Sequence, residues 1–419
     1  MTFLLITAIL ALILFGAPLF VVIAGLALFL FSSSQIDSSA MIIEMHRIAT
    51  TPILVAIPLF TFAGYVLSES GAPKRLIRLS DAILGWLPGG LSIIALVTCA
   101  TFTALTGATG LTIIALGGIL FPAMLKGRYP ENFSLGLLTT SGTLGLLFPP
   151  SLPLIIYAIV AKVGIDQLFL AGILPGILLV VLLSLFSIQK AIFAEVPRTR
   201  FSALEVLKSI KETIWELPLP IVVLGGIYSG YFVVSEAASI TAAYVLFVEV
   251  IIYRDIKWKE LPQIMRKSMV LVGGILIILG AALGLTNYLV DEEIPMKMLE
   301  FFKSHITSPL AFLGVTNFFL LVVGCIMGTF SALTVVIPLL TPIAQAYGIH
   351  PIHLGIIILT NLEIGASIPP VGINLFISSI RFEKPVLKLY LASLPFIVVL
   401  LVALAILTYF PWLSLALLK

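Results

Sequence analysis

Charged residues are the scarcest class in this sequence. Only 10% of the 419 residues are Asp, Glu, Lys or Arg, whereas 60% are hydrophobic. Soluble globular chains carry about 25% charged residues, so this composition excludes a soluble fold. The formal net charge of +3 is too small to indicate a nucleic-acid partner. The chain is therefore expected to be a polytopic membrane protein that binds no nucleic acid.

Cysteine and histidine are also rare, with two and four copies. Cys99 and Cys325 both lie in apolar runs, which predicts small core residues rather than a disulfide or a metal site. His350 and His353 are expected in a solvated loop, not as a metal pair. No Ser/His or Asp/Asp pair occupies corresponding helices, so an enzyme is not expected. Nothing resembles a nucleotide-binding loop, which leaves an ion gradient or a partner as the energy source.

The N-terminal segment could be mistaken for a signal peptide. Residues 1–31 contain no basic n-region, and their apolar run is about twice the length of an h-region. We expect this segment to remain in the mature chain as membrane structure.

Four long apolar segments contain interruptions. The runs 83–125 and 307–346 each fold about a Gly/Thr/Ser tip, which predicts re-entrant helical hairpins. The runs 133–160 and 352–380 contain Gly, Thr and Pro-Pro near their centres, which predicts broken transmembrane helices. Unwound backbone inside a membrane must be buried in protein or line a polar cavity. The four interruptions are therefore the places where a functional site is expected.

The sequence repeats itself at an offset of 220 residues. Four prolines coincide at this offset, where random placement gives about 0.7 coincidences. They are Pro122 with Pro342, Pro149-Pro150 with Pro369-Pro370, and Pro175 with Pro395. Thr109 also falls on Thr329, and Gly145 falls on Gly365. The chain is thus interpreted as a duplication.

Loop charges indicate that the two halves have opposite orientations. Short cytoplasmic loops are rich in Lys and Arg. The basic loop 74–78 corresponds to the acidic segment 291–293, and the neutral loop 162–166 corresponds to the basic loop 381–388. The fold class predicted is an all-α polytopic membrane protein with two inverted-topology repeats, each holding a re-entrant hairpin and a broken helix. The expected boundaries are 1–190, an amphipathic cytoplasmic linker 191–216, and 217–419.

Inverted repeats with broken helices at matching positions are typical of secondary transporters with midplane binding sites. Glycine and proline free backbone carbonyls, and Thr or Ser add hydroxyl oxygens, which together suit a dehydrated Na⁺. The first predicted sodium site comprises Thr106, Gly107, Thr109, Ser141, Gly142, Thr143 and Gly145. The second comprises Gly328, Thr329, Ser331, Glu363, Gly365 and Pro369. Predicted substrate-facing residues are Thr112, Thr140 and Asn374.

Each of these assignments has a structural alternative. Glycine and threonine in membrane helices can simply permit close packing. Glu363 is an expensive group inside a membrane and usually faces a cavity or partner, but it could be hydrogen-bonded to freed backbone. Glu236 is expected to serve a helix terminus.

Several motifs resemble the large membrane (M) subunit of tripartite ATP-independent periplasmic (TRAP) transporters. The resemblance runs from about residue 5 to the C-terminus. It rests on Ala56-Ile57-Pro58-Leu59-Phe60, Leu87-Pro88-Gly89-Gly90-Leu91, Gly142-Thr143-Leu144-Gly145 with Pro149-Pro150-Ser151, Glu236-Ala237-Ala238, and Pro369-Pro370-Val371-Gly372-Ile373-Asn374-Leu375-Phe376.

The resemblance implies an elevator-type, Na⁺-coupled importer of organic acids, such as sialic acid or C4-dicarboxylates, in a bacterial or archaeal cytoplasmic (inner) membrane. It also implies two partners, a small four-helix membrane (Q) subunit and a periplasmic substrate-binding (P) protein. Two departures favour backbone carbonyls over side-chain ligands. The first tip is poorer in Ser and Ala than usual in the family, and Ser331 stands where an acidic residue is common. A stand-alone carboxylate transporter and an ion channel remain as alternatives.

Overall fold

The computed structural model describes residues 18–197 and 201–418, and all regular secondary structure in these ranges is helical. Seven of the described helices are long and apolar enough to cross a membrane, or up to nine if two bent helix pairs each count as one. These helices confirm the prediction of an all-α polytopic membrane protein. The prediction for residues 1–31 lies partly outside the described residues, and α2 (Leu19–Ser33) is its described part.

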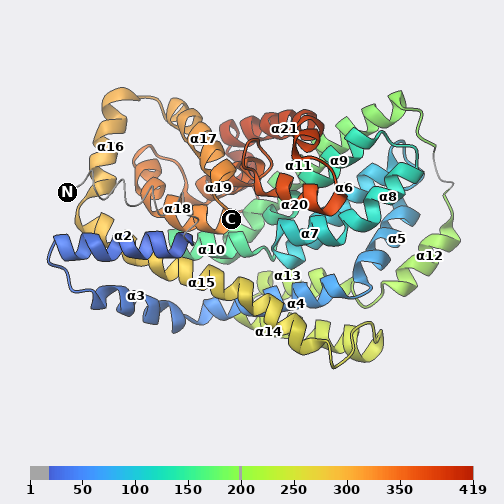
Figure 1. Ribbon diagram of the computed structural model, residues 1–419, viewed down its shortest axis with the longest axis horizontal. Coiled ribbons are helices and arrows are strands. Elements are labelled where there is room, and N and C mark those ends of the chain that lie inside the picture. Colours follow the sequence, from blue (N-terminus) through green and yellow to red (C-terminus); the bar gives the residue numbers. More distant parts are fainter. Residues whose placement is uncertain (1–17, 198–200, 419) are drawn as a thin grey trace.

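One side of the molecule is a layer of long helices, the lower band in Figure 1. Helix α15 crosses this layer and contacts α2, α3 and α4. The layer comprises α2, α3 (Ser39–Ala49), η1 (Pro52–Val55), α4 (Ala56–Glu69), α13 (Pro218–Tyr228), α14 (Val234–Leu246), η3 (Phe247–Ile252) and α15 (Leu261–Asp291). Glu236 accepts a hydrogen bond from the Val233 backbone N–H at the start of α14 (3.0 Å). Its predicted helix-terminus role is confirmed.

Two helical hairpins lie above this layer. The first is α6 (Gly90–Thr106) followed by α7 (Thr109–Ala115) and α8 (Gly117–Lys126), with a bend of 48° between α7 and α8. The second is α17 (Pro309–Ile326) and α18 (Thr329–Ala346), and α18 stays continuous through Pro338 and Pro342. Each hairpin reverses over only two residues, at Gly107-Ala108 and at Met327-Gly328.

Each hairpin is followed by a broken helix. In the first half, α9 (Glu131–Ser141) passes through η2 (Leu144–Leu147) and a cis Pro149-Pro150 bond to α10 (Leu152–Ala161), with a bend of 46°. In the second half, a cis Pro369-Pro370 bond separates α19 (Pro351–Gly365) from α20 (Ile373–Phe382). The breaks are followed by α11 (Ile165–Phe193) in the first half, and by α21 (Val386–Tyr409) and α22 (Trp412–Leu415) in the second.

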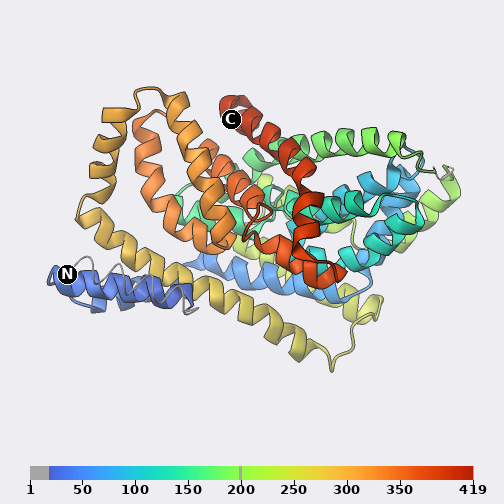
Figure 2. The ribbon, with the colours of Figure 1, turned by 45° about the horizontal axis from the view of Figure 1, so that its top comes forward.

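The two halves exchange contacts with each other. Helix α10 of the first half packs against α18 of the second, while α20 of the second half packs against α7 of the first. Likewise α9 contacts α21, and α19 contacts α11. Figure 2 shows these pairs interleaved in the core of the molecule. Reciprocal contacts between equivalent elements are the arrangement that two inverted repeats produce.

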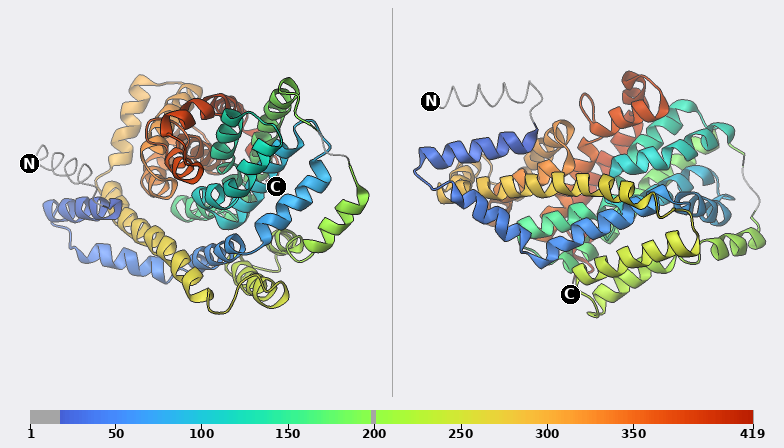
Figure 3. Two further views of the ribbon diagram at one scale, coloured as in Figure 1. Left: turned by 45° about the vertical axis from the view of Figure 1, so that its right-hand side comes forward. Right: turned by 60° about the horizontal axis from the view of Figure 1, so that its bottom comes forward.

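The segment between the halves is tied to the first half. Helix α12 (Ala203–Glu212) contacts α5 (Ala72–Leu84) at one end of the molecule (Figure 3). Arg75 of α5 pairs with three carboxylates, those of Glu216, Glu249 (2.9 Å) and Asp255 (2.6 Å). Burial opposes the charge of Arg75, but these carboxylates raise its pKa above the usual value. The corresponding helix of the second half, α16 (Ile294–His305), has no such cluster among its described contacts.

The expectation of a solvated loop is confirmed for His350, which is exposed and precedes α19, but not for His353. His350 caps α19, with Nδ1 accepting a hydrogen bond from the Ile352 N–H (3.3 Å). His353 is only 2% exposed, and its Nδ1 lies 2.7 Å from the Ser414 hydroxyl of α22. The expectation is wrong for His353 because α19 begins at Pro351 and its first turn packs beneath α22.

Candidate functional site

The first tip and the first break lie against each other. A methyl group added at Gly142 would lie 3.2 Å from the Thr109 carbonyl oxygen. One added at Gly107 would lie 2.5 Å from the Leu152 side chain at the start of α10. Gly107 has a φ of +66°, a left-handed conformation that glycine adopts without strain. The structure thus brings together the tip and break residues that the sequence assigned to the first sodium site.

The hydroxyl groups at the first tip and break differ in their partners. That of Thr109 donates to Asn374 (3.0 Å). Those of Thr140, Ser141 and Thr143 donate to carbonyls of the preceding turn, at 2.8, 3.3 and 2.7 Å. Those of Thr106 and Ser151 are buried without a hydrogen-bond partner among the described residues. A buried hydroxyl without a partner costs free energy, so these two oxygens are the ones available to a ligand. Sequence analysis missed Ser151, although it directly follows Pro149-Pro150.

Two glycines of the predicted sites hold helices together. A methyl group at Gly145 would lie 2.7 Å from the Ala104 backbone nitrogen of α6. One at Gly365 would lie 2.7 Å from the Gly324 carbonyl carbon of α17. In each half, the glycine before the Pro-Pro pair therefore lets the break approach the first arm of its own hairpin. This contact supports the packing alternative for both residues.

Glu363 dominates the second tip and break. Its side chain is 4% exposed, and neither carboxylate oxygen has a hydrogen-bond partner among the described residues. No Lys, Arg or His in the described chain lies within 4.0 Å of it. The polar side chain that faces it belongs to Thr329, at the start of α18. A buried carboxyl group of this kind needs a cation or a proton.

The remaining residues of the second site surround this carboxyl group less tightly. Gly328 is exposed and has nothing within 4 Å of an added methyl group. Ser331 and Pro369 are half-buried. The Cys325 thiol donates to the Ile368 carbonyl (3.2 Å), which ties the second break to α17. The second site is thus more open than the first.

Asn374 lies where the two halves meet. Its Oδ1 accepts a hydrogen bond from the Thr109 hydroxyl (3.0 Å), and its Nδ2 donates to Ser367 (3.3 Å). The other two predicted substrate residues are occupied elsewhere. Thr112 is hydrogen-bonded to Thr103 inside the first hairpin (2.6 Å), and Thr140 bonds within α9. Asn374 is therefore the predicted substrate residue that the structure places between a tip and a break.

Sequence reasoning also missed a polar cluster in the second half. The amide of Asn361 donates to Asn317 of α17 (2.8 Å), which in turn donates to Thr408 of α21 (2.9 Å). The Asn361 Oδ1 atom is buried without a hydrogen-bond partner in the described part of the chain. Two asparagines inside apolar runs were the signal that could have identified this cluster.

An apolar cavity of about 380 Å³ lies behind the first break, between α6, α11 and α13. Thr101 is its one polar side chain, and that hydroxyl bonds to the Val97 carbonyl (2.9 Å). No charged side chain lines this cavity, so it is unsuited to an organic anion.

Comparison with known proteins extends these observations. Residues 6–413 match the family described as "Tripartite ATP-independent periplasmic transporter, DctM component". The C4-dicarboxylate TRAP transporter large permease protein DctM of Pseudomonas aeruginosa is 37% identical over 94% of this chain and 92% of that protein. The isethionate TRAP transporter permease protein DctMQ of Oleidesulfovibrio alaskensis is 32% identical, over 94% of this chain and 63% of that protein.

A solved structure supports the architecture independently. The YdaH transporter of Alcanivorax borkumensis superposes with a TM-score of 0.63 over 90% of this chain and 88% of that chain. The two sequences are only 15% identical. At this identity the likeness concerns the fold alone.

Proposed function

Because the chain belongs to the DctM component family of tripartite ATP-independent periplasmic transporters, we propose that it is the membrane permease subunit of a Na⁺-coupled importer of organic acids. It has no enzymatic role in this proposal. It moves its substrate by an elevator mechanism, in which the hairpins and broken helices travel against the outer layer of long helices. The membrane is the cytoplasmic membrane of a prokaryote.

Glu363 is the observation that carries the coupling proposal. A carboxyl group with no partner, facing a hairpin tip inside a membrane, provides the charge that attracts a small cation. In the first half, the unpartnered hydroxyls of Thr106 and Ser151 offer oxygen ligands at the matching tip and break. One cation in each half, flanking Asn374, would couple the two tips to substrate binding.

The substrate class rests on the relatives. The Pseudomonas aeruginosa relative is named for C4-dicarboxylates and the Oleidesulfovibrio alaskensis relative for isethionate. Both are small organic anions, and C4-dicarboxylates are the class we propose for this chain. The helix N-terminus of α20 beside Asn374 offers a positive dipole end to such an anion.

Two partners complete the proposed transporter. A periplasmic binding protein delivers the substrate, and a small four-helix membrane subunit supports the permease. The name DctMQ of one relative, and the 63% of it that this chain covers, fit a small subunit that is fused to the permease there. A stand-alone carboxylate transporter of the same architecture is the competing function.

Uptake of radiolabelled succinate into proteoliposomes tests the coupling ion. With the chain and both partners present, an inward Na⁺ gradient should drive uptake, and replacing Na⁺ with K⁺ or choline should stop it. Full activity with a proton gradient in Na⁺-free buffer would overturn Na⁺ coupling.

The same vesicles test the need for partners. The chain reconstituted alone should take up no succinate, and adding the small subunit and the binding protein together should restore uptake. Sustained uptake by the purified chain alone would favour the stand-alone function.

A further inference from the structure

The two halves contain equivalent interfaces of opposite character. In one, α10 packs against α18; in the other, α20 packs against α7 and α8. At the repeat offset of 220, Leu154, Ala158 and Ala161 of α10 correspond to Asn374, Ser378 and Arg381 of α20. Residues spaced by three, four and seven lie on one face of a helix. Three apolar positions on this face of α10 are therefore polar on α20.

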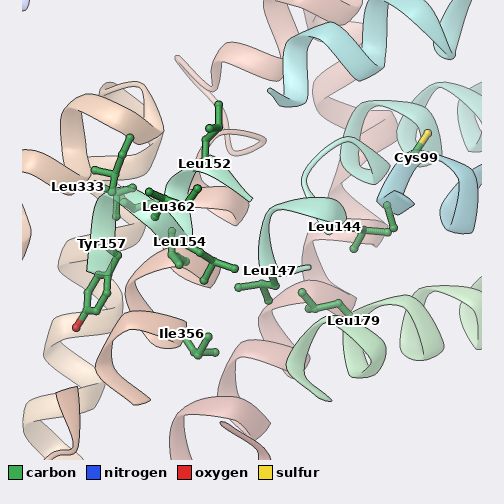
Figure 4. Close-up of a cluster of buried hydrophobic side chains, with 14 of the residues drawn as sticks. Cys99, Leu144, Leu147, Leu152, Leu154, Tyr157, Leu179, Leu333, Ile356 and Leu362 are labelled. Carbon is green, nitrogen blue, oxygen red and sulfur yellow. The ribbon is translucent and has the colours of Figure 1, made fainter. Parts of the chain in front are cut away.

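The α10 interface is mainly apolar. Figure 4 shows Leu152, Leu154 and Tyr157 of α10 among other buried side chains, with Leu333 of α18 and Leu362 of α19 nearby. Leu154 is fully buried. The hydrogen bond from α10 to the second half comes from Tyr157, whose hydroxyl donates to the Pro351 carbonyl of α19 (2.6 Å). The positions equivalent to Asn374, Ser378 and Arg381 are apolar there, so the equivalent packing does not explain the polar residues on α20.

The α20 interface carries polar groups along its whole length. Asn374 at its start bonds to Thr109, as described above. One turn further, the Ser378 hydroxyl is completely buried and has no hydrogen-bond partner among the described residues. Two turns from the start, the Arg381 guanidinium lies directly on Gly118 of α8, in space that any Cβ at position 118 would fill.

Arg381 is exposed, unlike Asn374 and Ser378, and it lacks a counter-ion. No carboxylate lies within 4.0 Å of it, and every Asp and Glu of the chain falls in the described ranges. The neighbouring basic residues differ, because Lys384 and Lys388 pair with Glu131 at 2.8 and 2.7 Å. These paired lysines already supply cytoplasmic positive charge to this loop. A residue that only directs membrane topology would not need the space that Gly118 leaves for the Arg381 guanidinium.

We propose that the face of α20 formed by Asn374, Ser378 and Arg381 binds the carboxylates of the transported acid, with Arg381 as the charged group on its cytoplasmic side. This inference rests on the proposed import of organic acids. Seven residues of helix separate Asn374 from Arg381 by about 10 Å. The Arg381 guanidinium lies beside Gly118, level with the end of α20, whereas Asn374 lies beside Thr109 at its start. A short dicarboxylate leaving Asn374 would then meet Ser378 and Arg381 before it reaches the cytoplasm.

Arginine suits this role because its planar guanidinium can hold a carboxylate through two parallel hydrogen bonds. Lysine would keep the charge but lose this geometry. Arg381→Lys therefore separates the effect of charge from the effect of shape, and its KM for succinate should be intermediate.

The experiment compares Arg381→Gln, Arg381→Lys and Lys384→Gln in proteoliposomes that contain both partners, with radiolabelled succinate as the probe. Lys384→Gln is the matched control. It removes a positive charge only three residues away from Arg381 in the sequence. We expect Arg381→Gln to raise the KM for succinate about tenfold or more, with an unchanged half-saturating Na⁺ concentration. Arg381→Lys should fall between it and the wild type, and Lys384→Gln should stay within about twofold of the wild type.

Several outcomes would overturn the inference. Equal effects of Arg381→Gln and Lys384→Gln, or a loss that follows the amount of inserted protein, would assign Arg381 to membrane topology. A wild-type KM in Arg381→Gln would remove it from the substrate path while leaving the proposed function intact. If the wild type itself takes up no succinate in a Na⁺ gradient, the proposed function fails, and the experiment then says nothing against Arg381 in particular.

Discussion

The first break is neutral and lies under a covered tip, whereas the second contains a buried carboxyl group and lies under an open tip. Both share a cis Pro-Pro bond and a glycine four residues before it, packed on the hairpin's first arm. Yet Thr143 of the first break, whose hydroxyl bonds to Thr140, corresponds to the unpartnered Glu363 of the second. The first tip is covered by Leu152, and the second, at Gly328, faces open space. The two repeats thus share the backbone conformation of the break but differ in the side chains around it.

The helices that precede the two hairpins also differ, but here it is the first half that contains the charged groups. Helix α5 of the first half is held to the outer layer by the carboxylates around Arg75, two of which are almost fully buried. Helix α16 of the second half lacks such a cluster among its described contacts. The first half thus combines a fixed entry helix with a neutral break, and the second combines a freer entry helix with a charged one. This pairing suits a second hairpin that responds to ion binding.

The largest effect is expected from Glu363→Gln. Removing the charge at the second break should lower Na⁺-driven succinate uptake about a hundredfold, the value of a lost charge-assisted contact. The variant should still insert and should be at least as stable without Na⁺, because an unpartnered buried charge is costly. Uptake against Na⁺ concentration and melting temperature with and without Na⁺ would measure both effects.

Thr143→Val is the control at the equivalent position of the first break. It removes one neutral hydroxyl that already has a backbone partner, so its effect on uptake should be much smaller. An unaltered half-saturating Na⁺ concentration in Glu363→Gln would remove this carboxyl group from ion coupling.

Exchanging the equivalent residues Leu154 and Asn374 gives the next largest effect. Asn374→Leu removes the hydrogen bond from Thr109 and should lower uptake about tenfold with little loss of stability. Leu154→Asn places an amide in the apolar contact with α18 and should cost about 1–3 kcal/mol of stability. Chemical denaturation and succinate uptake, measured on both variants, separate these results. Similar stability losses in both would mean that the two interfaces are alike.

Gly145→Val and Gly365→Val should each destabilise the protein by about 1–3 kcal/mol, because both side chains would meet the backbone of the neighbouring hairpin arm. The first variant should be the more damaging, since an added methyl group at Gly145 would lie closer to α6 than one at Gly365 would lie to α17. Melting temperatures check this order. A changed Na⁺ dependence with normal stability would instead indicate that these glycines belong to the sodium sites.

The sequence was sufficient for features that depend on local chemistry and on the repeat. Coinciding prolines located both breaks, and the Gly/Thr tips located both reversals, because few residue types tolerate such backbone. Glu236 was identified as a helix-terminal residue from its position beside a break. These inferences need no knowledge of which elements touch.

Other features depend on which helices meet in space and could not be predicted. Ser151 becomes a candidate ligand only because its hydroxyl is buried without a partner. His353 was placed in solvent because nothing in the sequence announces that α22 returns to cover it. The bond from Thr109 to Asn374 crosses 265 residues and joins different halves. The offset of 220 aligns equivalent positions, but it does not tell which ones are neighbours.

The smallest effects compare the two tips directly. Gly107 has a φ of +66°. A methyl group added at this position would lie 2.5 Å from the Leu152 side chain. Gly107→Ala should therefore cost about 1–2 kcal/mol, the strain of a left-handed residue with a side chain. Gly328 has a φ of −66° and open space around it, so Gly328→Ala should change stability by less than about 0.5 kcal/mol. Melting curves of the two variants test whether the tips differ as the structure indicates. Equal losses at both positions would mean that the second tip is closed in the membrane, and that the openness which distinguishes the two breaks is not a property of the working protein.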